Sequence, residues 1–197
     1  MLQLVNSEGQ TIGVADKIDA HREGGSLHRA VSVLLLDEAG RMLIQRRSDA
    51  KYHFAGKWAN ACCTHPLVGE SIEDAGSRAL REELGVEATL TEVLQFTYEA
   101  HDPTSGLTEQ EYDHVLTAVW SGEVRPNPNE VSTTEWVSSG DLVLRLIADP
   151  EQFAFWFRQI LKELACHCRG SMKCPPALAR FAGELQDAFD LSALGVT

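Results

Sequence analysis

Residues 71–85, SIEDAGSRALREELG, predict the helix around which the rest of the fold can be arranged. Ser71 is a favourable N-cap residue, and the acidic Asp74 follows it three positions later. Gly85 comes directly after the last turn, where a left-handed C-cap conformation favours glycine. These signals predict a helix from Ser71 to Leu84.

The segment just upstream, KWANACCTHP at residues 57–66, carries two adjacent cysteines followed by a histidine and a proline. In an extended strand, side chains alternate between the two faces, so Cys63 and His65 share one face while Cys62 points to the other. We expect Cys63 to be available for chemistry and Cys62 to pack. Taken alone, such a cysteine is a small buried apolar residue more often than a catalyst.

Further segments have the alternating pattern and turn residues of strands, or the apolar periodicity of helices. We predict three hairpins: residues 2–5 with 11–15, residues 30–36 with 41–47, and residues 91–100 with 109–120 across a loop at 101–108. After them we predict a strand at 133–137, a helix at 138–147 and a helical apolar stripe from Phe153 to Leu164. The chain then continues with a predicted loop at 166–176 and a predicted helix at 177–189. The pattern is α+β, with a mixed β-sheet flanked by helices, an N-terminal hairpin and an added C-terminal helical tail.

The chain of 197 residues, 44% hydrophobic, has the size of one domain, which we place at residues 1–165 with a tail at 166–197. No apolar run approaches the roughly 18 residues that span a bilayer, and the start has no basic region leading into an apolar stretch. A cytoplasmic location is therefore expected.

The five cysteines are an odd number without an export signal, so we expect free thiols rather than a disulfide framework. In the tail, Cys166, His167, Cys168 and Cys174 match no standard zinc spacing. Free thiols are predicted there as well.

Seventeen Lys and Arg against 29 Asp and Glu give a net charge of −12, which opposes general binding to nucleic acid or to anionic membranes. Between Arg41 and Lys57, however, five basic residues accompany a single acid, a local net charge of +4. This stretch could form a binding site for a small anion such as a phosphate ester, or it could be the solvated edge of a hairpin.

The helix and the loop before it resemble the Nudix box, G-x5-E-x7-R-E-x2-E-E-x-G. The matching residues are Glu70, Arg78, Glu82, Glu83 and Gly85. Thr64 replaces the opening glycine, and Ala79 replaces the glutamate after the arginine. Because Ala79 and Glu83 share a helix face, the carboxylate pair that helps a Nudix hydrolase hold magnesium is missing. Arg78 and Glu82, also four residues apart, fit an ordinary solvent-facing ion pair.

Several separated motifs over most of residues 1–165 resemble type 1 isopentenyl diphosphate isomerase, a family of the Nudix superfamily. WANACCTHP matches its cysteine, any residue, His-Pro pattern, with Cys63 at the catalytic position. KIDAHREGGSLHRAVSV and DPTSGLTEQEYDHV match its paired histidines and its E-x-E element. The resemblance implies a shift of the double bond of isopentenyl diphosphate to give dimethylallyl diphosphate, a step of isoprenoid biosynthesis.

The resemblance also implies a divalent metal site of imidazole and carboxylate ligands, suited to Mg²⁺, Mn²⁺ or Zn²⁺. Its ligands would be His21, His28, His65, Glu83, Glu109 and Glu111. A second ion, Mg²⁺, would arrive with the substrate and bridge its diphosphate to Glu83. Each histidine taken singly is more typical of a surface or core residue; the set in matching order favours a metal site.

For the reaction, the resemblance implies that Cys63 and Glu111 form a proton-transfer pair on opposite faces of the substrate, with Tyr98 beside Glu111. Trp156 would face the developing cation with its electron-rich ring, although its place on an apolar stripe is typical of packing. Lys17, Arg47 and Lys51 would bind the diphosphate. Ala79 stands where the family commonly has another arginine, so that phosphate contact is either missing or supplied by another residue.

Two other functions remain open from the sequence. A Nudix hydrolase of a nucleoside or prenyl diphosphate is disfavoured by Ala79 and gives no role to Cys63. A non-catalytic binding protein is disfavoured because every matched position keeps a reactive residue type. The expected partner is a small prenyl diphosphate, without nucleic acid or membrane, and the expected state is a monomer or weak homodimer.

Overall fold

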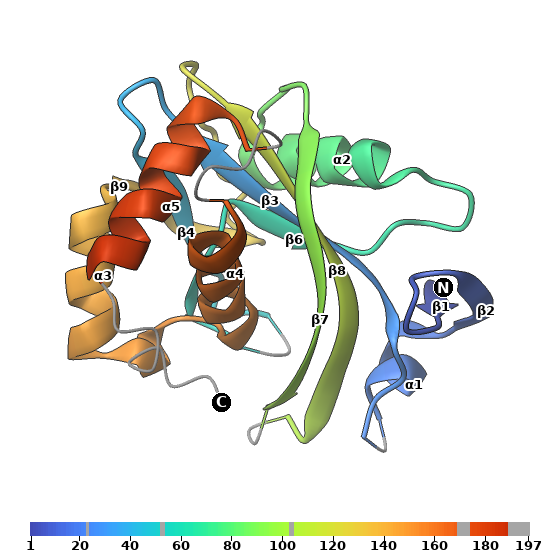
Figure 1. The fold of residues 1–197 in the computed structure, drawn as a ribbon. Coiled ribbons are helices and arrows are strands. Elements are labelled where there is room, and N and C mark those ends of the chain that lie inside the picture. Colours follow the sequence, from blue (N-terminus) through green and yellow to red (C-terminus); the bar gives the residue numbers. More distant parts are fainter. Residues whose placement is uncertain (23, 52–53, 103–104, 169–173, 189–197) are drawn as a thin grey trace.

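In the residues that the computed structural model describes (1–22, 24–51, 54–102, 105–168 and 174–188), nine strands form one mixed sheet with helices against both faces (Figure 1). The strands are β1 Leu2–Val5, β2 Thr11–Ala15, β3 His28–Leu36, β4 Met42–Arg47, β5 Trp58–Ala59, β6 Cys62–Thr64, β7 Thr91–Asp102, β8 Leu107–Val119 and β9 Val131–Val137. The helices are α1 Lys17–His21, α2 Ile72–Leu84, α3 Ser139–Ala148, the 3-10 turn η1 Pro150–Gln152, α4 Phe155–His167 and α5 Pro176–Ala188. The predicted α+β class and mixed sheet are confirmed.

Strand β3 organises the sheet. It pairs antiparallel with β1, β4 and β6 and parallel with β8, which makes the sheet mixed. The β3–β8 register places His28 opposite Glu111, and the β3–β6 register places Ser32 opposite Cys63. Residues far apart in the sequence are thereby brought to the same end of the sheet.

Alternation along β3 divides the core into two layers. Leu34 and Leu36 face α3, α4 and α5, whereas Val33 and Leu35 face α2. Figure 1 shows α3, α4 and α5 together on one side, with α2 apart from them and the β1–β2 hairpin at the far end. Nearer its start, the same face of β3 carries Ser32, Ala30 and His28, so polar side chains appear beside the small Ala30.

Helix α2 begins and ends as the sequence predicts. The Ser71 side chain accepts a hydrogen bond from the Asp74 amide at 3.1 Å, and Gly85 closes the helix with φ of 64°. The predicted N-terminal hairpin is also present as β1–β2. In the long β7–β8 hairpin, Tyr98 lies directly opposite Glu111.

Gly76 lets α2 approach the sheet closely. A Cβ at this position would lie 2.7 Å from Leu90 Cδ1 and 2.9 Å from Leu116 Cδ1. We expect Gly76→Ala to lower the free energy of unfolding by about 1–3 kcal/mol, because overpacking outweighs the helix propensity gained. Gly183→Ala in α5, where the new methyl meets nothing within 4 Å, should instead raise it by about 0.5–1 kcal/mol. Urea titration of both variants checks this, and stabilisation by Gly76→Ala would contradict the close contact.

Several element boundaries differ from the sequence predictions. The predicted loop at 101–108 is shorter, since β7 continues to Asp102 and β8 starts at Leu107, which pair with each other. Phe153 lies before α4, because an extended Ala154 separates it from the helix. The five-residue helix α1 was not predicted. Pro103, Thr104 and Phe189 lie outside the described residues.

The C-terminal tail is joined to the preceding helix by a disulfide. Cys166 and His167 continue α4 rather than starting the predicted loop, whose residues 169–173 are outside the described part of the chain. Cys168 and Cys174 form a disulfide with their Cα atoms 5.7 Å apart, so the free-thiol prediction is wrong for this pair. The physical reason is that α5 packs against α3 and α4, which brings the two cysteines within bridging distance.

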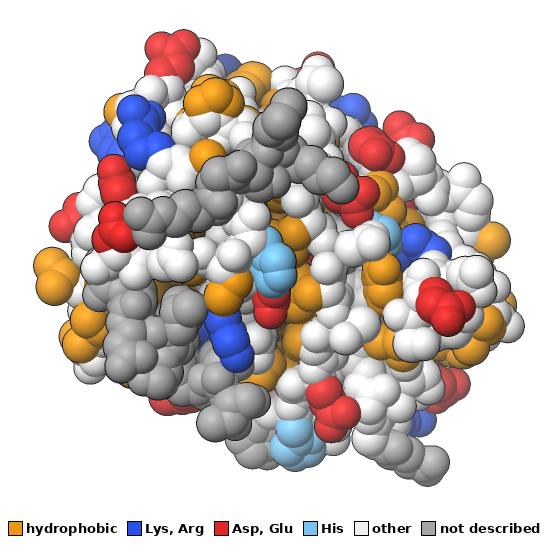
Figure 2. Space-filling view, viewed as in Figure 1, with side chains coloured by type: hydrophobic (Ala, Val, Ile, Leu, Met, Phe, Trp, Pro, Cys, Tyr) orange, Lys and Arg blue, Asp and Glu red, His pale blue; other side chains and the backbone are white. Residues whose placement is uncertain are grey.

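The described helices include none that is both long and apolar enough to cross a bilayer. On the face drawn in Figure 2, acidic side chains are spread over the surface and basic ones occur in small separate groups. The Lys and Arg side chains visible on that face therefore do not join into a continuous basic surface.

Candidate active site

A cavity of about 470 Å³ opens on the α4 side of the sheet, at the end where polar residues replace aliphatic ones. It is lined by most of the residues that the sequence singled out: Lys17, Arg47, Lys51, Cys63, His65, Glu83, Tyr98, Glu109, Glu111 and Trp156. The remaining two, His21 and His28, belong to a buried group beside it that includes His65 and Glu111.

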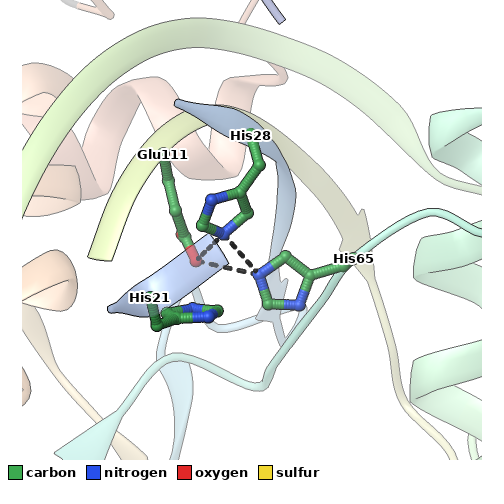
Figure 3. A group of neighbouring side chains, drawn as sticks. All are labelled: His21, His28, His65 and Glu111. Carbon is green, nitrogen blue, oxygen red and sulfur yellow. Dashed lines mark hydrogen bonds and ion pairs between the residues drawn. The ribbon is translucent and has the colours of Figure 1, made fainter. Parts of the chain in front are cut away.

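Three histidines and a glutamate converge from different elements (Figure 3). One ligand atom from each of His21, His28, His65 and Glu111 lies within 4.8 Å of all the others. His28 Nε2 is 3.2 Å from His65 Nε2, and Glu111 Oε1 is 3.0 Å from His65 Nε2 and 3.5 Å from His28 Nε2. The parallel β3–β8 pairing explains why His28 and Glu111 meet.

The donor set fits a divalent cation. Nδ1 of His21 lies 2.5 Å from the Lys17 carbonyl, and Nδ1 of His28 lies 2.7 Å from the Ser26 carbonyl. Carbonyl oxygens only accept, so each Nδ1 carries a hydrogen and Nε2 is the ring atom left to bind a metal, as in metal-binding histidines. Two imidazole nitrogens 3.2 Å apart beside a carboxylate oxygen are well matched to a shared cation.

Burial and charge set the protonation of this group. Burial lowers the pKa of His65 to about 4, which favours the neutral imidazole that a metal needs. Burial opposes ionisation of Glu111, but the hydrogen bonds with His28 and His65 outweigh it and hold the pKa of that carboxyl well below its usual range. Burial and then the charge of Glu111 raise the pKa of Glu109 to about 8. The ionised carboxylate is therefore assigned to Glu111.

The other two predicted ligands do not belong to the four-residue group. Glu109 lies beside it, with its Oε2 3.3 Å from the Tyr98 hydroxyl oxygen. Glu83 projects from α2 and accepts from Gln45 Nε2 at 3.2 Å. Burial raises the pKa of Glu83, and Lys51 and Arg47 are the cations that oppose this. The structure thus separates Glu83 from the histidines and places it with the basic residues.

Tyr98 joins the two strands of the long hairpin at the cavity. Its hydroxyl donates to Glu111 Oε2 at 2.6 Å. Burial and the charge of Glu111 raise the pKa of Tyr98 well above its usual range, so the hydroxyl keeps its proton. The carboxylate is held by Tyr98 through one oxygen and by the histidines through the other.

Cys63 and Cys62 lie on opposite sides of β6, as alternation predicts. Cys62 is fully buried in the apolar layer against α2, whereas Cys63 lines the cavity. Burial and then the charge of Asp113 raise the pKa of Cys63 well above its usual range, which keeps the group a thiol. Ser32 Oγ lies 3.5 Å from its sulfur.

Trp156 is both a core residue and a cavity wall. It is 3% exposed and packs with the α4 apolar residues, yet it also lines the cavity. The guanidinium carbon of Arg47 lies 5.2 Å from the ring centroid, a cation–π distance, and Phe54 meets the ring edge-on at 5.2 Å. The ring therefore already binds positive charge.

The basic residues gather at one part of the cavity. Arg47 donates from Nε to the Phe54 carbonyl at 3.2 Å, and Lys51 forms an ion pair with Glu130. Burial lowers the pKa of Lys51. The +4 stretch thus has two side chains, Arg47 and Lys51, directed to the cavity, whereas Arg46 is exposed.

The sequence interpretation missed residues that support the site from behind. Asn60, Ser32 and Asp113 are buried next to Cys63, and Ser32 Oγ donates to Asp113 Oδ2 at 2.7 Å. In the sequence, the signals that could have pointed to these residues are weak. Asn60 lies three residues before Cys63, and Ser32 falls on the same strand face as His28. Periodicity alone gives such small polar residues no function.

Arg78 has a different main partner from the one that helix spacing suggests. It forms two hydrogen bonds of 2.9 Å with Glu70, and Glu82 lies farther away at 3.6 Å. Arg78 also donates to the His65 carbonyl at 3.2 Å. The Nudix-box arginine therefore holds the loop that carries His65. Ala79, 2% exposed, packs in the apolar layer beneath α2.

The sequence matches the NUDIX domain over residues 26–161, which together with the fold defines a NUDIX-domain protein. The protein DR0079 of Deinococcus radiodurans has a similar structure, with a TM-score of 0.61 at 26% identity over 75% of this chain and 89% of that one. Proteins named isopentenyl-diphosphate Delta-isomerase are 44% identical in Nocardia farcinica (82% of this chain, 92% of the relative) and 46% in Streptomyces coelicolor (82% and 81%). The one in Serratia proteamaculans is 40% identical (85% and 92%). The chain belongs to the isopentenyl-diphosphate Delta-isomerase family.

Proposed function

We propose that this protein interconverts isopentenyl diphosphate and dimethylallyl diphosphate. The observation that carries the proposal is that one cavity brings together Cys63, the Tyr98–Glu111 pair and Trp156, with Arg47 and Lys51 on its wall. The names of the relatives point to the same reaction. An unactivated alkene is a poor base, so the reaction needs a placed acid, a placed base and a wall that stabilises positive charge.

The diphosphate is bound by the basic part of the cavity. Arg47, Lys51 and Lys17 supply positive charge. Glu83 lies near Lys51 and Arg47 and would help to hold a Mg²⁺ ion that arrives with the diphosphate. Binding at this end fixes the position of the hydrocarbon end. The binding energy of the diphosphate, which does not react, thus serves to orient the alkene, which does.

The reaction moves one proton onto the substrate and takes one off. One member of the Cys63 and Glu111 pair protonates the terminal methylene, and the electrons of the double bond form the new C–H bond. The tertiary cation that develops faces the Trp156 ring. The other member removes a proton from the carbon nearer the diphosphate, and that C–H bond supplies the new double bond. Tyr98 holds the Glu111 carboxylate in place through its 2.6 Å hydrogen bond.

His21, His28, His65 and Glu111 would hold a divalent ion. Glu109 lies beside this group and would be available as a further ligand. When bound, the ion supplies charge that fixes the orientation of the Glu111 carboxylate and tunes its basicity. Mg²⁺, Mn²⁺ and Zn²⁺ all accept such a mixture of imidazole and carboxylate ligands.

The direct test is to incubate the protein and Mg²⁺ with carbon-13-labelled isopentenyl diphosphate, following the label by NMR and free phosphate by colorimetry. We expect dimethylallyl signals without phosphate release. Released phosphate or pyrophosphate would instead identify a hydrolase. The buried Ala79 argues against a hydrolase, because Glu83 then has no carboxylate partner one helical turn earlier. An unchanged spectrum with Mg²⁺, Mn²⁺ and Zn²⁺ would identify a binding protein.

Arg47 and Arg46 make a matched pair for testing diphosphate binding. We expect Arg47→Gln to raise KM for isopentenyl diphosphate about 10–100-fold, since a charge-assisted hydrogen bond to phosphate contributes about 1.5–3 kcal/mol. Arg46→Gln, its exposed neighbour on β4, should leave KM within about twofold. Steady-state kinetics of both variants measure the difference, and equal KM values would remove Arg47 from the substrate site.

The cytoplasmic location and the monomeric or weakly dimeric state belong to the same proposal. Both suit a catalyst acting on a small charged metabolite. Analytical ultracentrifugation at micromolar concentration checks the second, and a tight dimer would contradict it.

A further inference from the structure

The side-chain amide of Asn60 connects the two walls of the cavity. Asn60 lies in the short bend between β5 and β6 and is fully buried. It contacts both the sulfur of Cys63 and the indole nitrogen of Trp156, which come from different parts of the chain.

Two carbonyl groups fix the orientation of this amide. Asn60 Nδ2 donates to the carbonyl oxygen of Cys62 at 2.8 Å and to that of Val33 at 3.2 Å. Because carbonyl oxygens only accept hydrogen bonds, the NH₂ end of the amide must face them. The oxygen end therefore faces Cys63 and Trp156.

The oxygen end then serves two donors at once. Asn60 Oδ1 accepts from Trp156 Nε1 at 3.2 Å and from Cys63 Sγ at 3.3 Å, while Nδ2 lies 3.2 Å from the same sulfur. Ser32 Oγ lies 3.5 Å from the same sulfur. One buried group therefore sets both the direction of the thiol and the position of the indole ring.

We infer that Asn60 is a positioning residue that fixes the Cys63 thiol and the Trp156 ring relative to each other, and so to the reacting carbons. The inference rests on the proposed isomerase function. Proton transfer to carbon depends on the distance and angle between donor and alkene, and a misplacement of about 1 Å costs on the order of 100-fold in rate. Asn60 itself lies behind Cys63 and Trp156 and acts through them.

The test uses Asn60→Ser, with Asn6→Ser in the N-terminal turn as a control for the substitution. We expect Asn60→Ser to lower kcat about 10–100-fold while KM changes less than about threefold, because the diphosphate contacts are untouched. Asn6→Ser should leave both unchanged. A kcat within twofold of the unmutated protein would overturn the inference.

A spectroscopic measurement separates positioning from general loosening. The indole N–H signal of Trp156 can be assigned by its absence in Trp156→Phe. In Asn60→Ser it should shift and exchange faster with solvent, while the indole signals of Trp58, Trp120 and Trp136 stay in place. Movement of all four signals together with a parallel rise in KM would mean a structural role only.

If Asn60→Ser does not fold, Trp156→Phe in a Cys166→Ser background decides the question. This variant keeps a ring but removes the indole N–H, which frees Oδ1 of Asn60 for the thiol alone. The rate of Cys63 alkylation by iodoacetamide should then change several-fold relative to Cys166→Ser, whereas an unchanged rate would overturn the coupling. These relative measurements also separate the inference from the proposed function, which fails only if the unmutated protein does not isomerise the substrate.

Discussion

Replacement of Cys63 by serine is expected to lower kcat for isomerisation by about 10²–10⁴-fold without unfolding the protein, the range typical of a lost acid or base. A serine hydroxyl is a far weaker acid than a thiol, and its smaller oxygen lies farther from the reacting carbon. The contacts of Cys63 with Asn60 and Ser32 can also be made by a hydroxyl, so the cavity should keep its shape. The measurement is turnover of carbon-13-labelled isopentenyl diphosphate alongside a thermal melt.

The neighbouring cysteine provides the matched control. Cys62 is fully buried in the apolar layer against α2, so Cys62→Ser places a hydroxyl where the described residues are apolar. We expect a loss of about 1–3 kcal/mol of folding stability with kcat nearly unchanged. If Cys62→Ser reduced turnover as much as Cys63→Ser at a temperature where both are folded, the assignment of Cys63 would be wrong.

Glu111→Gln is expected to have an effect of similar size, with kcat lower by about 10²–10⁴-fold. The carboxylate is placed by the 2.6 Å hydrogen bond from Tyr98 and by His65 at 3.0 Å, and an amide of the same shape can neither transfer the proton nor supply the negative charge. Glu99→Gln, an exposed glutamate on β7 that accepts from Gln110, should retain full activity.

Metal content distinguishes the two roles of Glu111. The proposed site loses one ligand in Glu111→Gln, so the protein should bind its divalent ion more weakly, as measured by elemental analysis after dialysis. Saturation with Mg²⁺, Mn²⁺ or Zn²⁺ should then refill the site but leave kcat low. Full recovery of kcat on adding metal would show that Glu111 serves only as a ligand and not in proton transfer.

The sequence determined the local elements and the residue types of the site. Ser71 and Gly85 delimit α2 because capping depends on a few neighbouring residues, and strand alternation correctly separated Cys62 from Cys63. Of the residues that the resemblance to the isomerase family supplied, all but His21 and His28 line one cavity, and those two lie beside it. The resemblance did not predict that Glu83 is separated from the histidines. Sequence patterns within single helices and strands could not predict that Glu83 lies with the basic residues, because this depends on how α2 packs on the sheet.

Only the tertiary structure decided which residues act together. Parallel pairing of β3 with β8 places His28 against Glu111, and helix packing brings Cys168 to Cys174 against the free-thiol prediction. The buried amide of Asn60 meets Trp156 only because α4 packs over the end of the sheet. Such contacts join segments that are distant in the chain, and they depend on how strands and helices pack rather than on the pattern within any one of them.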